Sequence, residues 1–504
     1  MSLHEQLWSY LERYKCPLSG KEFLPLGILE EKITSDIVKK ELCGDGWEKQ
    51  LTLLRYPSLP QKVSQDAKKV FAILVLIGNP WAIKRLIREG LTDRHLPLRQ
   101  GGSGFLESSD NTTFKSPGAW GTDATVKLFI DKQWLVLAPV LDSTGQDIKL
   151  SDKCKCALPI CDANHRAIDG FSSKVRKGII PAGHQKGFKV EGTSLDIAIK
   201  EITDKDIFLL EKKNLNDIRR LQHRHLIKHI ATCQIRDGYC YAILFPWASG
   251  GNLSNFWTHK DSTERAPDLF LWCFQQLLGL VDALKALHSI NCRHGDLKPE
   301  NILYFKEGDY LDIGGEGVLV IADVGVSKVH VDRTVSRPMG TNTHATTPSY
   351  EAPEAQFDKD AARARRYDMW SIGCIFLEFA IWLLYDLDAI KNFRKWREES
   401  RCDPITPKAS FYDRPTEGIV DVQPAVRKMM YQLRNNSRCQ NGTALGDFLD
   451  LIENDLLLVE VSRRCHAAEL YNKLKKIVQD AEENASYLLN DADSHPPTPL
   501  IFVD

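Results

Sequence analysis

Apolar residues recur at helical spacing through the first hundred positions of the chain. Leu3, Leu7 and Leu11 follow one another every four residues, which places them on one face of an α-helix. The segment Val70 to Ile77 is apolar throughout but too short to cross a bilayer, so it is interpreted as a buried helix. We therefore expect residues 1–100 to form a mainly helical region.

The next stretch is predicted to link this region to the rest of the chain. Residues 101–123 are rich in Gly, Ser, Asn and Thr, which favours a loop. Two short apolar runs follow, Thr125 to Ile130 and Trp134 to Val140, and they predict a strand pair with a turn at Asp131-Lys132. Residues 101–160 are thus expected to form a linker with a strand pair.

The periodicity changes after residue 160, first to alternating strands and after residue 265 to helices. This order predicts an α+β fold with a small β-rich lobe over residues 161–249 and a large α-rich lobe over residues 250–476. The polar, proline-bearing end of residues 477–504 predicts a partly flexible tail. Residues 1–160 carry no catalytic constellation; they are interpreted as a helical accessory region, with an independent binding module as the alternative.

Composition narrows the classes of function. At 504 residues, with 43% hydrophobic and 26% charged residues, the chain is typical of a soluble protein of two or three domains. A net charge of −1 gives no reason to expect a nucleic acid or a membrane as a partner. The 13 scattered cysteines and a start without a secretory signal favour reduced thiols and a cytoplasmic or nuclear location. The oligomeric state stays open.

Short motifs then appear in a fixed order downstream of Ile197-Ala198-Ile199-Lys200. They are His294-Gly295-Asp296-Leu297-Lys298-Pro299-Glu300-Asn301, Asp323-Val324-Gly325 and Ala352-Pro353-Glu354. Together they resemble the signature of eukaryotic Ser/Thr protein kinases. The stretches Cys292 to Leu303 and Asp368 to Leu384 also resemble a large group of fungal protein kinase-like proteins that have a helical N-terminal extension.

The resemblance implies a two-lobed protein kinase-like fold that uses ATP with Mg²⁺ and phosphorylates Ser or Thr hydroxyls of a protein substrate. Asp296 is then the candidate catalytic base, and Lys298 is expected to reach the γ-phosphate. Asn301 and Asp323 offer hard oxygen ligands of the kind that Mg²⁺ prefers.

Lys200, at the end of the apolar strand that starts at Leu195, is expected to reach the α- and β-phosphates. Its carboxylate partner on the following helix has two candidates. The usual spacing from His223 points to Asn214, which cannot form an ion pair, whereas one further helical turn points to Glu211. We favour Glu211, and the choice between the two stays open.

The glycine-rich loop of Ile168 to Val175 keeps only the middle glycine, Gly170, of the family pattern. This departure predicts a looser loop and weaker ATP binding. Val175 and Ala198, the latter on the strand of Lys200, are expected to lie against the nucleotide.

Phe245 to Leu253 resembles the hinge between kinase lobes, with Phe245 behind the adenine. The resemblance implies that adenine meets the carbonyl of Pro246 and the amide of Ala248. Both groups are available, because proline lacks only its N–H.

Three residues are interpreted as structural supports. Asp368 is expected to anchor the backbone of the catalytic loop, and Arg464 to pair with Glu354. Two positions depart from the family: Gly295 replaces an arginine that meets an activating phosphate, and Val324 is a smaller apolar plug than the usual phenylalanine.

The competing hypotheses are an active protein kinase and a pseudokinase that serves as a nucleotide-binding or scaffolding module. The incomplete glycine-rich loop, Asn214 in one register and Gly295 favour the second. Lys200, Asp296, Asn301 and Asp323 together favour the first. A small-molecule kinase is a weaker third idea, since Thr347 to Glu354 is typical of a peptide-binding platform.

Overall fold

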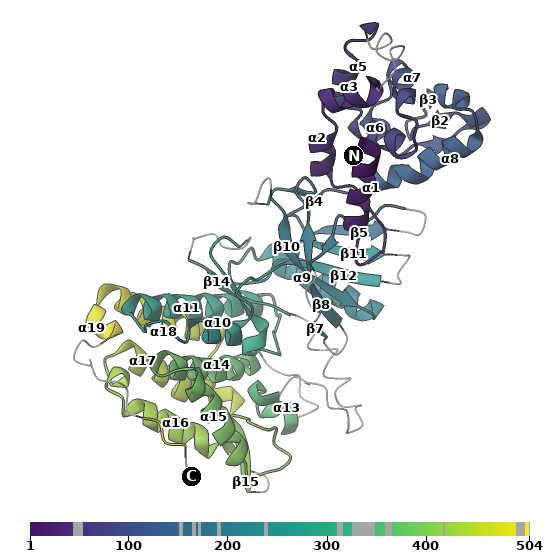
Figure 1. Ribbon diagram of the computed structural model, residues 1–504. Coiled ribbons are helices and arrows are strands. Elements are labelled where there is room, and N and C mark those ends of the chain that lie inside the picture. The colour runs from purple at the N-terminus through teal and green to yellow at the C-terminus, as the bar shows by residue number, and fades with distance from the viewer. Residues whose placement is uncertain are drawn as a thin grey trace. The chain divides into compact units, whose positions relative to one another are not determined.

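The computed structural model describes residues 1–43, 54–150, 155–163, 168–169, 173–188, 193–235, 240–309, 316–324, 348–357, 365–416, 419–489 and 499–502. The chain divides into two compact units (Figure 1). Unit 1 comprises Met1–Phe208 and His229–Trp247, and unit 2 comprises Leu209–Lys228 and Ala248–Asp504.

Unit 1 begins with a group of helices that share one apolar core. Leu7 and Leu11 of the first helix are fully buried, and the apolar helix α6 is buried from Val70 to Leu76. The helical region predicted for residues 1–100 is therefore confirmed. Its helices are α1 (Leu3–Arg13), α2 (Leu26–Lys32), α3 (Ser35–Cys43), α5 (Leu59–Asp66), α6 (Lys68–Leu76) and α7 (Ile83–Arg88), with 3₁₀ turns at Pro80–Ala82 and Asp93–His95.

The strand pair predicted in the linker is wrong. This part of the chain forms helix α8 (Asp123–Lys132) and a 3₁₀ turn at Gln133–Val136. Val126 and Phe129, three residues apart, are buried, whereas Leu128 is exposed. The apolar positions that reach the core thus follow helical spacing, and the apparent alternation includes a residue that faces solvent. Before α8 lies a small sheet of β1 (Arg99–Gln100), β2 (Leu106–Glu107) and β3 (Thr113–Phe114).

The main sheet of unit 1 has seven strands in the order β5-β11-β12-β10-β8-β6, with β7 also paired to β8. These strands are β5 (Gln146–Leu150), β6 (Cys161–Asp162), β7 (Ile168–Asp169), β8 (Ser173–Ile180), β10 (Leu195–Ile202), β11 (Ala231–Ile235) and β12 (Cys240–Pro246). Strand β5 comes from the predicted linker and runs parallel to β11, from Gln146 opposite Ala231 to Leu150 opposite Ile235. Residues 101–160 therefore build part of the sheet instead of only connecting to it.

The side chain of His184 joins the helical region to the strands that follow it. Its Nε2 accepts a hydrogen bond from the Leu26 amide at 3.0 Å, and its Nδ1 donates to the Pro139 carbonyl at 2.9 Å. Burial lowers the pKa of His184 to about 4, so the ring is neutral. The same turn leads into β9 (Gln185–Lys186), which pairs in parallel with β4 (Leu141–Asp142).

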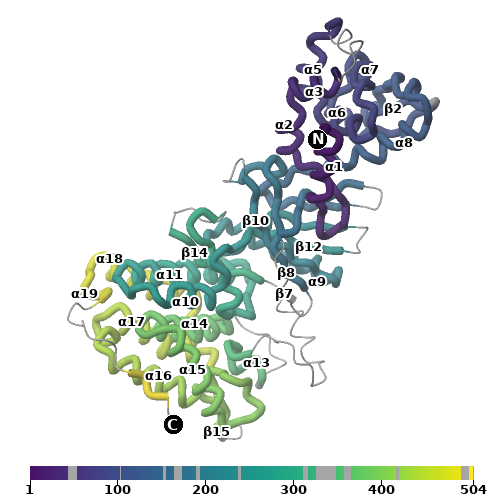
Figure 2. Tube along the Cα trace, in the orientation of Figure 1, coloured from purple at the N-terminus to yellow at the C-terminus, as the bar shows by residue number. Residues whose placement is uncertain are grey.

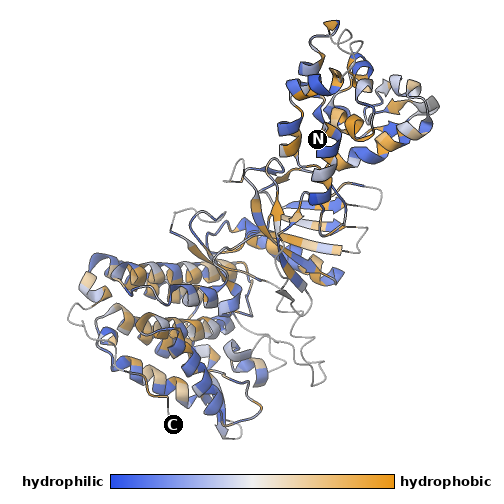
Figure 3. Cartoon of the chain, viewed as in Figure 1, coloured by the Kyte–Doolittle hydropathy of each residue, from blue (hydrophilic) through white to orange (hydrophobic). Residues whose placement is uncertain are grey.

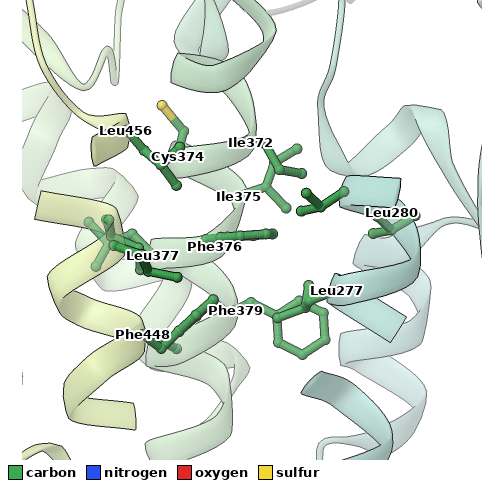
Figure 4. Close-up of a cluster of buried hydrophobic side chains, with 14 of the residues drawn as sticks. Leu277, Leu280, Ile372, Cys374, Ile375, Phe376, Leu377, Phe379, Phe448 and Leu456 are labelled. Carbon is green, nitrogen blue, oxygen red and sulfur yellow. The ribbon is translucent and has the colours of Figure 1, made fainter. Parts of the chain in front are cut away.

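Unit 2 is mainly helical and surrounds one long apolar helix, α14 (Arg366–Leu384). Phe376 of α14 packs against Phe448 of α17, with ring centroids 5.0 Å apart, while Leu280 of α11 lies on the other side of α14 (Figure 4). The other helices are α9 (Lys205–Arg220), which begins in unit 1, α10 (Leu253–Lys260), α11 (Pro267–Ser289), α13 (Glu354–Phe357), α15 (Leu387–Glu399), α16 (Pro424–Arg434), α17 (Ala444–Leu451), α18 (Ala467–Glu483) and α19 (Ala485–Leu488).

Helices α11 and α14 are long and apolar enough to span a membrane by length and composition alone. The apolar window of α14 is completely buried within the protein, and half of that of α11 is buried. Figure 3 shows the apolar residues of unit 2 concentrated on these packed helices. Both helices contribute residues to the core of unit 2.

Two short hairpins complete unit 2: β13 (Ile302–Phe305) with β14 (Val318–Ile321), and β15 (Tyr412–Thr416) with β16 (Ile419–Val422). The last long helix, α18, lies beside α11 (Figure 2). Near the C-terminus, the Gln432 side chain of α16 exchanges two hydrogen bonds with the backbone of Ile501. Strands in unit 1 and helices in unit 2 confirm the α+β class.

Candidate active site

In unit 1, strand β10 and its two neighbours gather four of the predicted nucleotide-binding residues. Lys200 lies opposite Val175 of β8, and Ala198 lies opposite Phe245 of β12. Opposed residues of antiparallel strands share a face, and so do alternate residues along one strand. All four are half-buried, and they form one face of the sheet: Val175, Ala198, Lys200 and Phe245. Gly170, the remaining glycine of the loop, lies outside the described residues.

The predicted hinge begins where β12 ends. Pro246 is the last residue of β12 and lies opposite Ile197, so its carbonyl is the final one of the strand. Ala248 is the first residue of the following turn, in which the Gly251 amide donates to the Ala248 carbonyl at 3.1 Å.

In unit 2, glycines let this turn lie directly on Tyr304. The Gly250 amide donates to the Tyr304 carbonyl at 3.1 Å, and the Tyr304 amide donates to the Gly251 carbonyl at 2.7 Å. A Cβ at Gly250 would come within 2.3 Å of the Tyr304 ring, and Gly251 has a φ of +73°. Both positions therefore require glycine.

The predicted catalytic loop, His294 to Asn301, is held through its backbone by Asp368 of α14. The His294 amide donates to Asp368 Oδ2 at 2.9 Å, and the Gly295 amide donates to Oδ1 at 2.8 Å. The predicted anchoring role of Asp368 is therefore confirmed. Burial opposes ionisation of this carboxyl, but a hydrogen bond from His288 at 2.8 Å and nearby imidazoles leave the pKa of Asp368 below its ordinary value.

The buried ring of His294 connects the two ends of the loop. Its Nδ1 accepts a hydrogen bond from the Asp296 amide at 3.2 Å, so Nε2 carries the proton and donates to the Ala322 carbonyl at 2.9 Å. This tautomer links the position of Asp296 to the residue that precedes Asp323.

The side chains of Asp296, Lys298 and Asn301 form one hydrogen-bonded group. Lys298 Nζ donates to Asp296 Oδ2 at 2.7 Å, and Asn301 Nδ2 donates to the same oxygen at 3.1 Å and to the Asp296 carbonyl at 2.7 Å. The Asp296 side chain remains 46% exposed, whereas that of Lys298 is only 10% exposed. The arrangement presents an oriented carboxylate to solvent beside a buried cation, as proton acceptance or hydroxyl alignment requires.

A small hollow of about 20 Å³ adjoins this carboxylate. Its walls come from the catalytic loop, from the residues around Tyr350, and from α14: Asp296, Leu297, Lys298, Pro348, Tyr350, Glu351, Tyr367 and Ser371. A hydroxyl group that entered it would meet the carboxylate of Asp296.

Asp323 follows β14, after the hairpin that starts at Asn301. The Ala322 amide donates to the Asn301 carbonyl at 2.9 Å, which ties the two predicted metal ligands to one pair of strands. Asp323 is exposed and has a φ of +59°, a conformation that aspartate tolerates better than most residues. Val324 is buried, with 1% exposure, as expected for an apolar plug.

The donor atoms of this region suit a hard cation. Both hydrogen bonds of the Asn301 amide use Nδ2, which leaves Oδ1 as an oxygen donor, and Asp323 adds an exposed carboxylate. Divalent magnesium binds through such carbonyl and carboxylate oxygens together with phosphate oxygens. Asn301 and Asp323 therefore fit the metal that accompanies a nucleotide triphosphate.

The helix predicted to carry the partner of Lys200 is α9. Glu211 is 3% exposed and shares a buried face with Leu215 and Ile218, whereas Asn214 is only half-buried. A carboxylate on the buried face of α9 is consistent with Glu211 as the partner of Lys200. The choice of Glu211 over Asn214 remains a prediction.

Arg464 makes the predicted ion pair with Glu354. Its two terminal nitrogens donate to the two carboxylate oxygens at 2.8 and 2.9 Å, and its side chain is completely buried. The pair fixes the start of α13, and the prediction is confirmed.

Two supporting histidines were not predicted from the sequence. His288 bonds to Asp368, and His294 accepts a hydrogen bond from the Asp296 amide. The sequence around each histidine, an apolar helix or a loop, does not indicate such a role. The spacing of His294, two residues before Asp296, was the available signal.

Comparison with known proteins places this geometry in a family. Residues 186–409 match the model of the protein kinase domain. The calcium/calmodulin-dependent protein kinase type 1 of Macrobrachium nipponense is 33% identical over 190 residues, which are 37% of this chain and 48% of that protein. The serine/threonine-protein kinase chk-2 of Caenorhabditis elegans is 34% identical over 102 residues, 20% of this chain and 19% of that protein.

A fungal relative, the calcium/calmodulin-dependent protein kinase of Metarhizium anisopliae, is 30% identical over 227 residues, 43% of this chain and 52% of that protein. The chain thus spans about half or less of the length of these relatives. Their names all describe protein kinases, and the matched region contains the predicted catalytic loop, the Asp368 anchor and strands β10 and β12. Strand β8, which carries Val175, precedes the matched region. Residues 186–409 therefore correspond to a protein kinase domain, and through this region the chain is similar to eukaryotic protein kinases.

Proposed function

We propose that the protein transfers the γ-phosphoryl group of ATP to Ser or Thr hydroxyls of a protein substrate. The observation that carries the proposal is the hydrogen-bonded group of Asp296, Lys298 and Asn301 beside a hollow that admits a hydroxyl. A relative that is named a serine/threonine-protein kinase supports the class of acceptor.

In this proposal Asp296 orients the acceptor hydroxyl and accepts its proton, and Lys298 neutralises charge that develops at the transferred group. Lys200, together with Val175, Ala198 and Phe245, binds the nucleotide on the half-buried face of the sheet. The protein contributes mainly orientation and charge, since phosphoryl transfer demands little covalent chemistry from an enzyme.

We propose Mg²⁺ as the divalent cation, held by Asn301 and Asp323. When bound with ATP, the cation supplies charge neutralisation at the phosphate oxygens. The oxygen donors of these two residues support magnesium over softer metals, which prefer nitrogen or sulfur.

The pseudokinase alternative is less favoured. Its support is the loss of glycines around Gly170, which weakens phosphate binding, together with Gly295 and Asn214 in one register. None of these departures removes a group that handles the proton or the metal. The hydrogen bonds among Asp296, Lys298 and Asn301 keep the acceptor side of the site assembled.

The test is incorporation of labelled phosphate from ATP into a generic basic protein by the purified full chain, with Mg²⁺ and no other kinase. Asp296→Asn should lower the rate by about 100-fold or more, since a positioned acid or base contributes 10²- to 10⁴-fold. Asp388→Asn is the matched control, because this aspartate is 77% exposed on α15. Acid hydrolysis of the product should yield phosphoserine or phosphothreonine.

Equal labelling by wild type and Asp296→Asn would contradict the assigned base. A thermal shift with Mg²⁺-ATP, which Asp296→Asn should retain, tests nucleotide binding separately. A wild type that binds Mg²⁺-ATP and labels nothing would support the pseudokinase instead.

A further inference from the structure

Tyr350 forms part of the wall of the hollow beside Asp296, and its position is set by α14. The Tyr350 hydroxyl donates to Glu378 Oε2 at 2.6 Å, and the Tyr350 carbonyl accepts a hydrogen bond from the Ser371 hydroxyl at 2.8 Å. The carboxylate of Glu378, on the apolar helix α14, therefore holds this part of the wall in place.

Glu378 would be unfavourable there without a cation. It is 2% exposed, in a helix whose neighbouring positions are all apolar and buried. Arg397 of α15 supplies the charge: its Nη2 donates to Glu378 Oε1 at 2.9 Å, and its own side chain is 1% exposed. One carboxylate thus joins Arg397 on one oxygen to Tyr350 on the other.

Arg397 is itself held tightly. Its guanidinium carbon lies 4.2 Å from the ring centroid of Phe393 and 3.8 Å from that of Phe411. Such cation–π contacts are strongest when water is excluded. The Gln423 side chain also donates to the Arg397 carbonyl at 2.7 Å. The two rings thus lie against the guanidinium, whose Nη2 reaches Glu378.

We infer that Arg397 is a positioning residue for the phosphoacceptor, acting through Glu378 and Tyr350 on the wall of the hollow at Asp296. It touches neither substrate nor nucleotide. Its guanidinium holds one oxygen of the Glu378 side chain in place, and the other oxygen accepts the hydrogen bond of the Tyr350 hydroxyl. The inference rests on the proposed function, because it concerns how that function aligns its acceptor.

Steady-state kinetics with a generic basic protein as acceptor separate this role from a general loss of structure. Arg397→Met should lower kcat/KM for the acceptor by about tenfold or more, since misplacement of about 1 Å is costly for an aligned reaction. The KM for ATP should stay within about twofold, because the nucleotide residues are not part of this contact chain. Arg394→Met on the same helix, 48% exposed, is the matched control and should behave as wild type.

A double-mutant cycle tests the route through the carboxylate. Tyr350→Phe removes only the hydroxyl and should act in the same direction, and Arg397→Met combined with Tyr350→Phe should be no worse than Arg397→Met alone. Arg397→Lys, which keeps the charge, should recover part of the lost activity. Should Arg397→Met fail to fold, Tyr350→Phe and Glu378→Gln test the inference instead. Each should lower kcat/KM for the acceptor and leave the KM for ATP nearly unchanged.

Additive effects in the cycle, or an Arg397→Met protein with wild-type acceptor kinetics, would overturn the inference. Equal changes in the constants for acceptor and ATP would also overturn it, because they indicate a general structural effect. Wild type and Asp296→Asn run alongside distinguish the two proposals: an inactive wild type contradicts both, whereas an active wild type with an unaffected Arg397→Met contradicts only this one.

Discussion

The guanidinium of Arg464 grips the carboxylate of Glu354 with two parallel hydrogen bonds, Nη1 to Oε1 at 2.8 Å and Nη2 to Oε2 at 2.9 Å. Nη2 also donates to the Val459 carbonyl at 3.1 Å. The pair joins the start of α13 to the segment before α18, across more than a hundred residues of chain. A charge pair of this geometry fixes the end of the segment that carries Tyr350.

Arg464→Met should lower the free energy of unfolding of unit 2 by about 3 kcal/mol, at the lower end of the range for breaking a buried ion pair. Glu354 remains 17% exposed, so water relieves part of the cost. Differential scanning calorimetry of the full chain measures the change. Arg463→Met, one residue earlier and exposed, is the control. A loss equal to that of the control would show that the pair contributes nothing.

Acid should destabilise unit 1 through His184. Burial lowers the pKa of His184 to about 4 from an ordinary 6.5, so between these values the unfolded state binds more protons than the folded state. Stability is therefore present above pH 6.5 and lost as pH falls towards 4, by up to about 1.4 kcal/mol per pH unit.

His184→Asn removes the titrating ring but keeps a donor and an acceptor. The variant should be less stable at pH 7.5 and should lose less stability than wild type between pH 7.5 and 5, as measured by thermal unfolding. His225, whose pKa burial also lowers to about 4, is unchanged in both proteins and contributes the same background. Parallel curves would show that His184 does not titrate on unfolding.

Asp323→Asn should raise the Mg²⁺ concentration for half-maximal activity by roughly 10- to 100-fold, the range seen when groups around a bound metal are altered. Removing one negative charge weakens the attraction for the cation. Titration of Mg²⁺ at constant ATP measures the effect. An unaltered metal requirement would remove Asp323 from the predicted ligand set.

The two registers on α9 predict opposite outcomes. If Glu211 supports Lys200, Glu211→Gln should lower kcat/KM by about tenfold or more, because the lysine loses its ion pair while the buried shape is kept. Asn214→Ala, three residues along the helix, should then change the rate little. A harmless Glu211→Gln with a damaging Asn214→Ala would move the assignment to Asn214.

Contiguous motifs were the part of this protein that sequence could predict. The loop from His294 to Asn301 carries its motif within eight residues, so its resemblance to the kinase signature was sufficient to propose its roles. Asp368 and Arg464 could be predicted because each lies in a recognisable motif of its own. Local helices such as α1 followed from apolar spacing.

Long-range contacts were beyond that reasoning. Strand β5 pairs with β11 across about eighty positions, and no local pattern specifies a parallel partner at that distance. In α8, exposed Leu128 made helical spacing resemble alternation. Glu378 lies within an apolar helix, and its cation, Arg397, could be identified only from the packing of α15.

Strand β5, which pairs in parallel with β11 at one edge of the main sheet, lies outside the matched kinase region. A protein shortened to residues 186–409 would keep β11 and lose β5, and the backbone groups from Ala231 to Ile235 would face water on one side. An exposed edge strand with unpaired backbone groups can pair with a strand of another chain. We therefore expect the segment before the kinase region to reduce aggregation by pairing with β11.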